Sequence, residues 1–132
     1  MTQSDSFSYR KLPLRDGAGT VPALGSARSF PMATETRNAT RTATRAGFRH
    51  LDCAERYRNE EQVGHAIRGA IQAGWINRND LFITTKLWND NHRPERVRPA
   101  IEASRERLQL EYIDLYLMHT MHTPYAFRSG TI

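Results

Sequence analysis

The chain has 132 residues, a net charge of +5 and a hydrophobic content of 39%, values that fit one modest domain with a single core. No apolar run approaches the roughly 20 residues of a transmembrane helix, the first residues lack the regions of a signal peptide, and the single cysteine, Cys53, excludes an internal disulfide. The arginines are scattered and accompany no zinc, RNP or helix-turn-helix motif, so we expect a cytoplasmic protein without a membrane or nucleic-acid partner.

The N-terminal third predicts a β-hairpin followed by a helix. The segments Phe7 to Leu14 and Thr20 to Leu24 flank the turn Asp16-Gly17-Ala18-Gly19, a pattern typical of two antiparallel strands. A helix is expected from about Thr34 to Ala46, with Gly47 as its C-terminal cap.

The buried face of that first helix is expected to be thin. Thr40 and Thr44 stand where larger apolar side chains would pack better, and the apolar stripe consists only of Ala39, Ala43 and Ala46. We therefore expect the chain to be less stable than an ordinary domain of its length.

Short apolar strands and amphipathic helices then alternate along the chain. Strands are expected at Phe48–Asp52, Leu81–Lys86 and Tyr112–His119, and helices at Asn59–Ala73 and Pro94–Leu108. The helical spacing of apolar side chains supports both helices: Val63, Ala66, Ile67, Ala70 and Ile71 in one, Val97, Ile101 and Leu108 in the other. This alternation predicts an α/β fold with a parallel sheet, and no linker or repeat marks a second domain.

Each of those three strands ends on an ionisable side chain: Asp52, Lys86 and His119. The C-terminal ends of parallel strands meet at one edge of a sheet, where ligands bind. A cation after an apolar strand is costly to bury unless it is paired, so we expect Lys86 to have an acidic partner. The three side chains therefore predict one site.

Two other kinds of site find no support in the sequence. Neither a Gly-x-Gly-x-x-Gly nor a Walker-type loop occurs, which weighs against an ordinary Rossmann or P-loop domain. His65 and His92 have no metal-like spacing to cysteine or carboxylate residues, so we expect no metal, and we expect Cys53 to be structural.

Three segments together closely resemble the aldo-keto reductases. They are Gly47-Phe-Arg-His-Leu-Asp52-Cys-Ala-Glu-Arg-Tyr57-Arg-Asn-Glu60, Leu81-Phe-Ile-Thr-Thr-Lys86-Leu-Trp88-Asn and Tyr112-Ile-Asp-Leu-Tyr-Leu-Met-His119. Asp52 and Tyr57 match the family's His-x-Asp-x-Ala-x-x-Tyr segment, Lys86 its Thr-Lys-Leu-Trp strand, and His119 the histidine that ends its fourth strand. The resemblance runs from about Leu12 to Phe127, and the segment from Met121 to Phe127 is most similar to fungal glycerol, glyceraldehyde and sugar-acid reductases.

The resemblance implies a fold, namely a parallel (β/α) barrel of TIM type preceded by an N-terminal β-hairpin. A complete barrel of this kind needs roughly 250 residues, so residues 1–132 would form a single partial domain, truncated after the fourth barrel strand. We expect such a half barrel to associate with something that covers its open edge and interior face.

The resemblance also implies a reaction, the NADP-dependent reduction of a sugar-type or small aldehyde or ketone to an alcohol. Tyr57 would donate the proton, helped by the charge of Lys86, which favours the phenolate; Asp52 would pair with Lys86, and both would contact NADPH. Tyr57, His119 and Trp88 would bind the substrate, His119 by orienting its carbonyl group and Trp88 as an apolar wall.

Three departures from the family pattern leave alternatives open. Polar Ser26-Ala27-Arg28-Ser29-Phe30 stands where a buried first strand is expected, Arg58 replaces the usual glycine after the tyrosine, and a Met-His-Thr duplication makes His122 a second candidate for the role of His119. With most of the family's nucleotide site beyond residue 132, we expect weak NADPH binding. A truncated, inactive reductase and a non-catalytic regulatory barrel remain alternatives.

Overall fold

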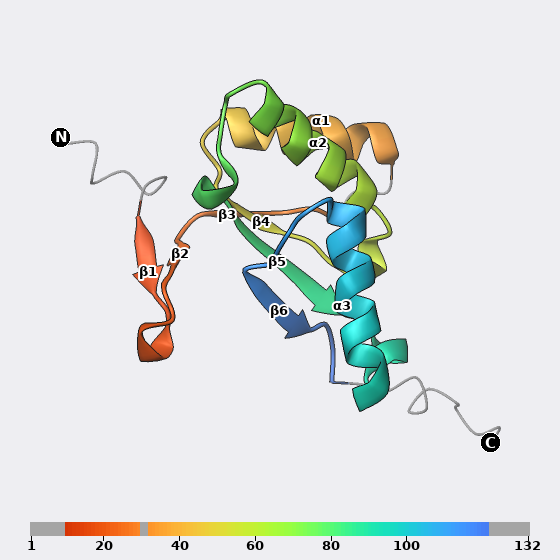
Figure 1. Ribbon diagram of the computed structural model, residues 1–132. Helices are drawn as coiled ribbons and strands as arrows, with labels where there is room; N and C mark the ends of the chain where they lie inside the picture. The colour runs from red at the N-terminus through yellow and green to blue at the C-terminus, as the bar shows by residue number, and fades with distance from the viewer. Residues whose placement is uncertain (1–9, 30–31, 122–132) are drawn as a thin grey trace, which may run out of the picture.

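The computed structural model describes residues 10–29 and 32–121, and its centre is a sheet of four parallel strands. The strands are β3 (Gly25–Ala27), β4 (His50–Asp52), β5 (Phe82–Leu87) and β6 (Leu115–Met118). They are hydrogen-bonded in the order in which they follow one another in the chain, and every pair is parallel. Figure 1 shows them side by side.

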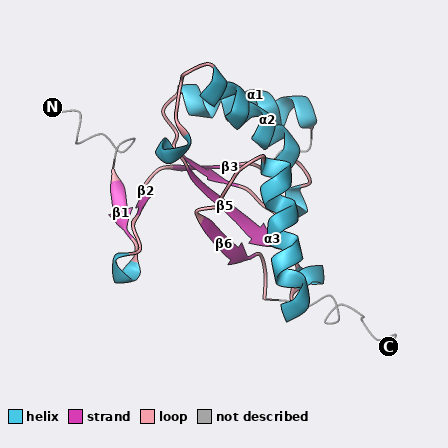
Figure 2. Ribbon diagram, in the orientation of Figure 1, coloured by secondary structure: helices cyan, strands magenta, loops and turns pink. Residues whose placement is uncertain are grey.

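Three α-helices connect these strands: α1 (Ala33–Arg45), α2 (Glu60–Gln72) and α3 (Pro94–Leu108). Strand and helix alternate (Figure 2). Each helix carries the chain back across the sheet, so that the next strand runs in the same direction as the one before. The predicted α/β class and all three predicted helices are confirmed. Gly47 follows α1 with φ +96°, a left-handed conformation that glycine adopts without strain and that ends a helix.

A separate two-stranded antiparallel sheet precedes the parallel one. Strand β1 (Lys11–Pro13) pairs with β2 (Thr20–Pro22), and a short 3-10 turn (Arg15–Gly17) lies between them. The predicted hairpin is confirmed, although its strands are shorter than expected, and the predicted stretch from Phe7 to Tyr9 lies outside the described residues.

The segment that departs most from the family pattern still forms the first parallel strand. Gly25, Ser26 and Ala27 lie opposite His50, Leu51 and Asp52 of β4. The backbone of the next residue, Arg28, continues the pairing, because its N–H donates to the carbonyl of Asp52 at 2.9 Å. The strand therefore forms through backbone pairing with β4, without the apolar side chains that usually mark a buried strand.

The core lies between the parallel sheet and the helices. Its largest fully buried apolar side chains come from both layers: Leu51 and Ile83 from the sheet, Val63 and Ile67 from α2, and Leu108 from α3. Alternate strand residues point to the other face, so Asp52 and Lys86 leave this core and face the opposite side of the sheet.

The buried face of α1 agrees only in part with the predicted one. Ala43 is buried and Thr40 and Thr44 lie on the buried face, as predicted, whereas Ala39 is only half-buried and Ala46 is exposed. The buried residues are Ala43 and three threonines, Thr36, Thr40 and Thr44. Their hydroxyls donate to the carbonyls four residues earlier, at 3.0, 2.7 and 2.8 Å. These bonds satisfy the polar atoms and so allow a threonine face to be buried.

Candidate active site

The strand ends bring a lysine and an aspartate into contact. Asp52 ends β4, Lys86 lies near the end of the neighbouring β5, and the Nζ of Lys86 donates to Oδ1 of Asp52 at 2.6 Å. The same Nζ also donates to the carbonyl of Cys53 at 2.9 Å. The Lys86 side chain is 14% exposed and that of Asp52 33%. As expected from the apolar strand, the cation is therefore paired, and two acceptors fix its position.

A chain of three aromatic rings begins beside this ion pair. Tyr57 ends a 3-10 turn (Glu55–Tyr57), and its ring centroid lies 5.2 Å from the Nζ of Lys86. His119, just after β6, packs edge-on against both Tyr57 and Trp88, with centroid distances of 5.6 and 5.4 Å. The structure thus brings together every site residue that the sequence indicated within the described part of the chain. His122, the second candidate histidine, lies outside it.

The surroundings of His119 favour the neutral form of its imidazole. Burial lowers the pKa of His119, and the charges of Lys86 and Arg56 lower it further, whereas Asp52 raises it. The Nδ1 atom is buried and has no hydrogen-bond partner among the described residues. A neutral imidazole has one N–H donor and one acceptor nitrogen, so His119 can donate a hydrogen bond to a carbonyl oxygen.

A second histidine, His50, precedes Asp52 by two residues in β4 and so lies on the same face of the sheet. Nε2 of His50 is hydrogen-bonded to the hydroxyl of Thr84, one strand away, at 2.9 Å. Gly25 of β3 makes room for the ring, because a Cβ at that position would lie 2.9 Å from Nδ1 of His50. Burial also lowers the pKa of His50. His50 therefore fills the floor of the site as a hydrogen-bonded structural side chain.

The turn that carries Tyr57 contains a strained residue. Arg58 has φ +54° and ψ +31°, in the left-handed region, and a residue other than glycine pays roughly 1–2 kcal/mol to adopt it. The family's usual glycine at this position therefore has a conformational reason, and Arg58 keeps the conformation without the freedom of glycine. Its side chain is exposed.

One residue that sequence reasoning missed is Glu55, which joins two loops of the site. Its carboxylate accepts hydrogen bonds from the backbone N–H of Trp88 at 3.3 Å and from Nδ2 of Asn91 at 3.0 Å. The guanidinium of Arg56 lies 5.1 Å from the centroid of the Trp88 ring. Glu55 thus ties the Tyr57 turn to the Trp88 loop. No motif signals it, because the contact joins residues 33 positions apart.

Other kinds of site have little support in the described residues. Among them, no three histidine, cysteine, aspartate or glutamate side chains gather as a metal site would require, and no helix has the length and hydropathy needed to cross a membrane. Cys53 is buried, and burial raises the pKa of its thiol, which makes a thiolate nucleophile there unfavourable.

Comparison with known proteins shows the family to which this chain belongs. The model of the aldo/keto reductase family matches residues 17–128. Human aldo-keto reductase family 1 member C1 is 49% identical over 114 residues, which are 84% of this chain and 35% of that protein. Human member C3 is 50% identical over 125 residues, 92% of this chain and 38% of that protein.

Among solved structures, the chain is similar to a Bombyx mori aldo-keto reductase in complex with NADP. The TM-score is 0.79 and the sequence identity 42%, over 83% of this chain and 37% of the other. The chain therefore spans a little more than a third of the length of the relatives that it matches.

Proposed function

Since the chain belongs to the aldo/keto reductase family, we propose that it carries the catalytic side chains for the NADP-dependent reduction of an aldehyde or ketone to an alcohol. The observation behind this proposal is the Lys86–Asp52 ion pair beside the Tyr57 ring, with His119 edge-on to the same ring. A small or sugar-type carbonyl compound is the proposed substrate.

Tyr57 is the proposed proton donor. When a carbonyl group is reduced, its carbon receives a hydride and its oxygen becomes a developing alkoxide, which needs a proton. The hydroxyl of Tyr57 supplies that proton and becomes a phenolate, and the ammonium of Lys86 stabilises the negative charge left behind. Asp52 and the carbonyl of Cys53 hold the ammonium in place, so no reorganisation of Lys86 is needed during the reaction.

His119 and Trp88 are proposed to orient the substrate. A neutral imidazole donates a hydrogen bond to the carbonyl oxygen without competing for its proton, and burial, which lowers the pKa of His119, favours that form. Edge-on packing against Tyr57 and Trp88 fixes the plane of the His119 ring. The indole of Trp88 gives the pocket an apolar wall that excludes water.

The chain's own residues fit the reactive end of a nicotinamide cofactor. The Asp52 side chain is a third exposed despite its ion pair, and the buried Nδ1 of His119 lacks a partner among the described residues. Polar atoms at this edge of the sheet can therefore still form hydrogen bonds with a ligand. Asp52 and Lys86 are the proposed cofactor contacts. NADPH, when bound, supplies the hydride for the reduction.

The proposal is tested by introducing the substitution Tyr57→Phe into the natural protein and measuring the purified variant. We expect kcat for a small aldehyde such as 4-nitrobenzaldehyde to fall by about 100-fold or more, the scale of general acid catalysis, because phenylalanine keeps the ring but not the proton. NADPH binding, followed by nucleotide fluorescence, should be unchanged.

Tyr112→Phe is the matched control, since the Tyr112 side chain is exposed and its hydroxyl bonds to Asn79 on the surface. The control should keep the wild-type rate. A Tyr57→Phe protein that also keeps it would show that another group donates the proton.

A further inference from the structure

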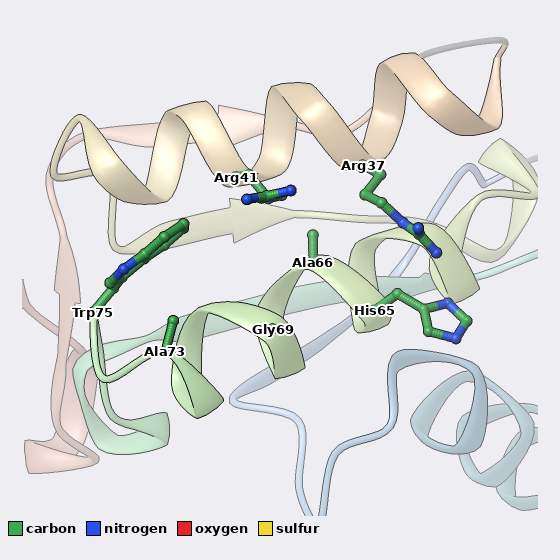
Figure 3. Close-up of a pocket in the computed structure, with 7 residues that line it drawn as sticks. All are labelled: Arg37, Arg41, His65, Ala66, Gly69, Ala73 and Trp75. Carbon is green, nitrogen blue, oxygen red and sulfur yellow. The ribbon is translucent and has the colours of Figure 1, made fainter.

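A groove on the outer surface lies between α1 and α2, apart from the site described above. Its volume is about 360 Å³. Figure 3 shows Arg37 and Arg41 projecting from α1 across the groove, and Trp75 and His65 at its two ends. Trp75 lies in the connection from α2 toward the start of β5, whereas the candidate active site is at the C-terminal ends of the strands. Nothing in the proposed reaction uses this groove.

The wall formed by α1 is cationic. Arg37, Arg41 and Arg45 are spaced four residues apart, so they stack along one face of the helix, where like charges repel each other. Among the described residues none of the three has an ion pair, and no acidic side chain lines the groove. Arg41 and Arg45 lie 5.6 and 4.9 Å from the centroid of the Trp75 ring. The groove is therefore complementary to a negative charge.

The floor formed by α2 is apolar and open. It consists of Ala66, Gly69 and Ala73. Glycine inside a helix lowers its stability, and packing gives Gly69 no reason to be there, since a Cβ at this position would meet nothing within 4 Å. In contrast, Gly64 of the same helix is needed, because its Cβ would lie 2.6 Å from the carbonyl oxygen of Leu108. Gly69 thus leaves space that the fold itself does not require.

Trp75 completes the groove with an aromatic surface. Its side chain is 39% exposed, and an indole offers a ligand both a large apolar surface and an N–H donor. Three groups that the fold itself does not require therefore lie together: arginines without an ion pair among the described residues, a helical glycine with free space above it, and a partly exposed indole. All three meet in one groove whose volume is in the range of small-molecule sites.

We propose that this groove binds a small aromatic anion. The aromatic ring would lie on the floor of Ala66, Gly69 and Ala73 against the edge of Trp75, and a phosphate, sulfate or carboxylate group would accept hydrogen bonds from Arg37 and Arg41. The guanidinium group matches the geometry of such anions with two parallel N–H donors. This site is independent of the proposed reductase activity.

The test is a titration of the ¹⁵N-labelled chain with phenyl phosphate, followed by NMR. The indole N–H resonance of Trp75, assigned with Trp75→Phe, should shift saturably. Phenyl phosphate should bind about tenfold more tightly than inorganic phosphate or phenol, because each of these offers only half of the contacts, and tenfold corresponds to about 1.4 kcal/mol. Added NaCl should weaken binding.

Two sets of variants examine the walls and the floor separately. The double variant Arg37→Ala/Arg41→Ala should weaken binding by about tenfold or more through loss of the charged donors, whereas Arg98→Ala, an exposed arginine on α3, should not change it. Gly69→Leu should block the floor, whereas Gly69→Ala should leave room for the ligand. Circular dichroism checks that each variant is folded, and if Gly69→Leu unfolds, the arginine variants decide.

Three results would overturn the proposal. They are a Trp75 resonance that does not respond to phenyl phosphate, an unchanged affinity in Arg37→Ala/Arg41→Ala, and a response confined to the indole of Trp88, which would place the ligand in the candidate active site.

Discussion

Removing one member of the Lys86–Asp52 pair should destabilise the fold far more than removing the other. Asp52→Ala leaves the ammonium of Lys86 with a single acceptor, the carbonyl of Cys53, where only 14% of the side chain meets water. Lys86→Met leaves a carboxylate whose side chain is 33% exposed, so water can solvate it, and methionine keeps most of the apolar stem of lysine.

These exposures set the magnitudes. Stranding a buried charge costs about 3–5 kcal/mol, and the small residual exposure of Lys86 puts Asp52→Ala near the lower end, at about 3 kcal/mol. A charge that stays solvated loses little more than an exposed ion pair contributes, so Lys86→Met should cost about 1 kcal/mol. A domain has a net stability of about 5–15 kcal/mol, so the first loss is a large part of the whole.

Urea unfolding followed by circular dichroism measures both changes. The double variant Asp52→Ala/Lys86→Met should be more stable than Asp52→Ala alone, because no unpaired charge remains. Glu102→Ala is the control, since it breaks the Glu102–Arg105 pair, whose side chains are 45% and 38% exposed, and should change the stability by less than about 1 kcal/mol. Equal losses in the two single variants, or simple addition in the double variant, would refute this reasoning.

Three further predictions concern the helix glycines, the loop clamp and pH. Gly64→Ala should destabilise the fold by about 1–3 kcal/mol, because the new Cβ would lie 2.6 Å from a backbone carbonyl oxygen of α3. Gly69→Ala should stabilise the fold by about 0.5–1 kcal/mol. The melting temperatures of the two variants should therefore shift in opposite directions. Glu55→Ala should release the tryptophan loop of the site, seen as faster amide exchange in residues 88–91, and Glu55→Gln, which keeps an acceptor oxygen, should restore part of the protection. Burial lowers the pKa of both His50 and His119 below the ordinary 6.5. As the pH falls through 6.5, these histidines therefore gain protons in the unfolded chain before they do so in the folded chain, which lowers the stability. The midpoint of urea unfolding should be constant above pH 6.5 and fall below it.

The helices were predictable because their signals are local. The boundaries of α2 and α3 follow from apolar residues at helical spacing, and Gly47 marks the end of α1. Strand β3 was not predictable in this way, since Gly25, Ser26 and Ala27 show no apolar alternation and are ordered by pairing with β4. The face of α1 was predictable in part: Thr40 and Thr44 lie on it as expected. Thr36 was missed because threonine counts as polar in a hydropathy pattern, although its hydroxyl can be satisfied within the helix.

In the candidate site, too, some residues were predictable from local patterns and others were not. Asp52, Lys86 and His119 were predictable as neighbours because each follows an apolar strand of a parallel sheet, whose ends meet at one edge. Glu55 was not, because its partner Trp88 lies on another loop and only the folded chain brings the two together. Periodicity reveals which residues reach a site, whereas the contacts that hold loops in place depend on the tertiary arrangement.

The threonine face of α1 has a consequence for the dynamics of the chain. Thr36, Thr40 and Thr44 direct their hydroxyls back to the carbonyls of their own helix, so α1 buries less hydrocarbon than α2, which contributes Val63 and Ile67 to the core. Partial unfolding begins where the least apolar surface is lost, so we expect α1 to detach from the sheet before α2 does. A ligand that bridges the arginines of α1 to the floor of α2 would then stabilise the packing of the two helices and oppose this first step of unfolding.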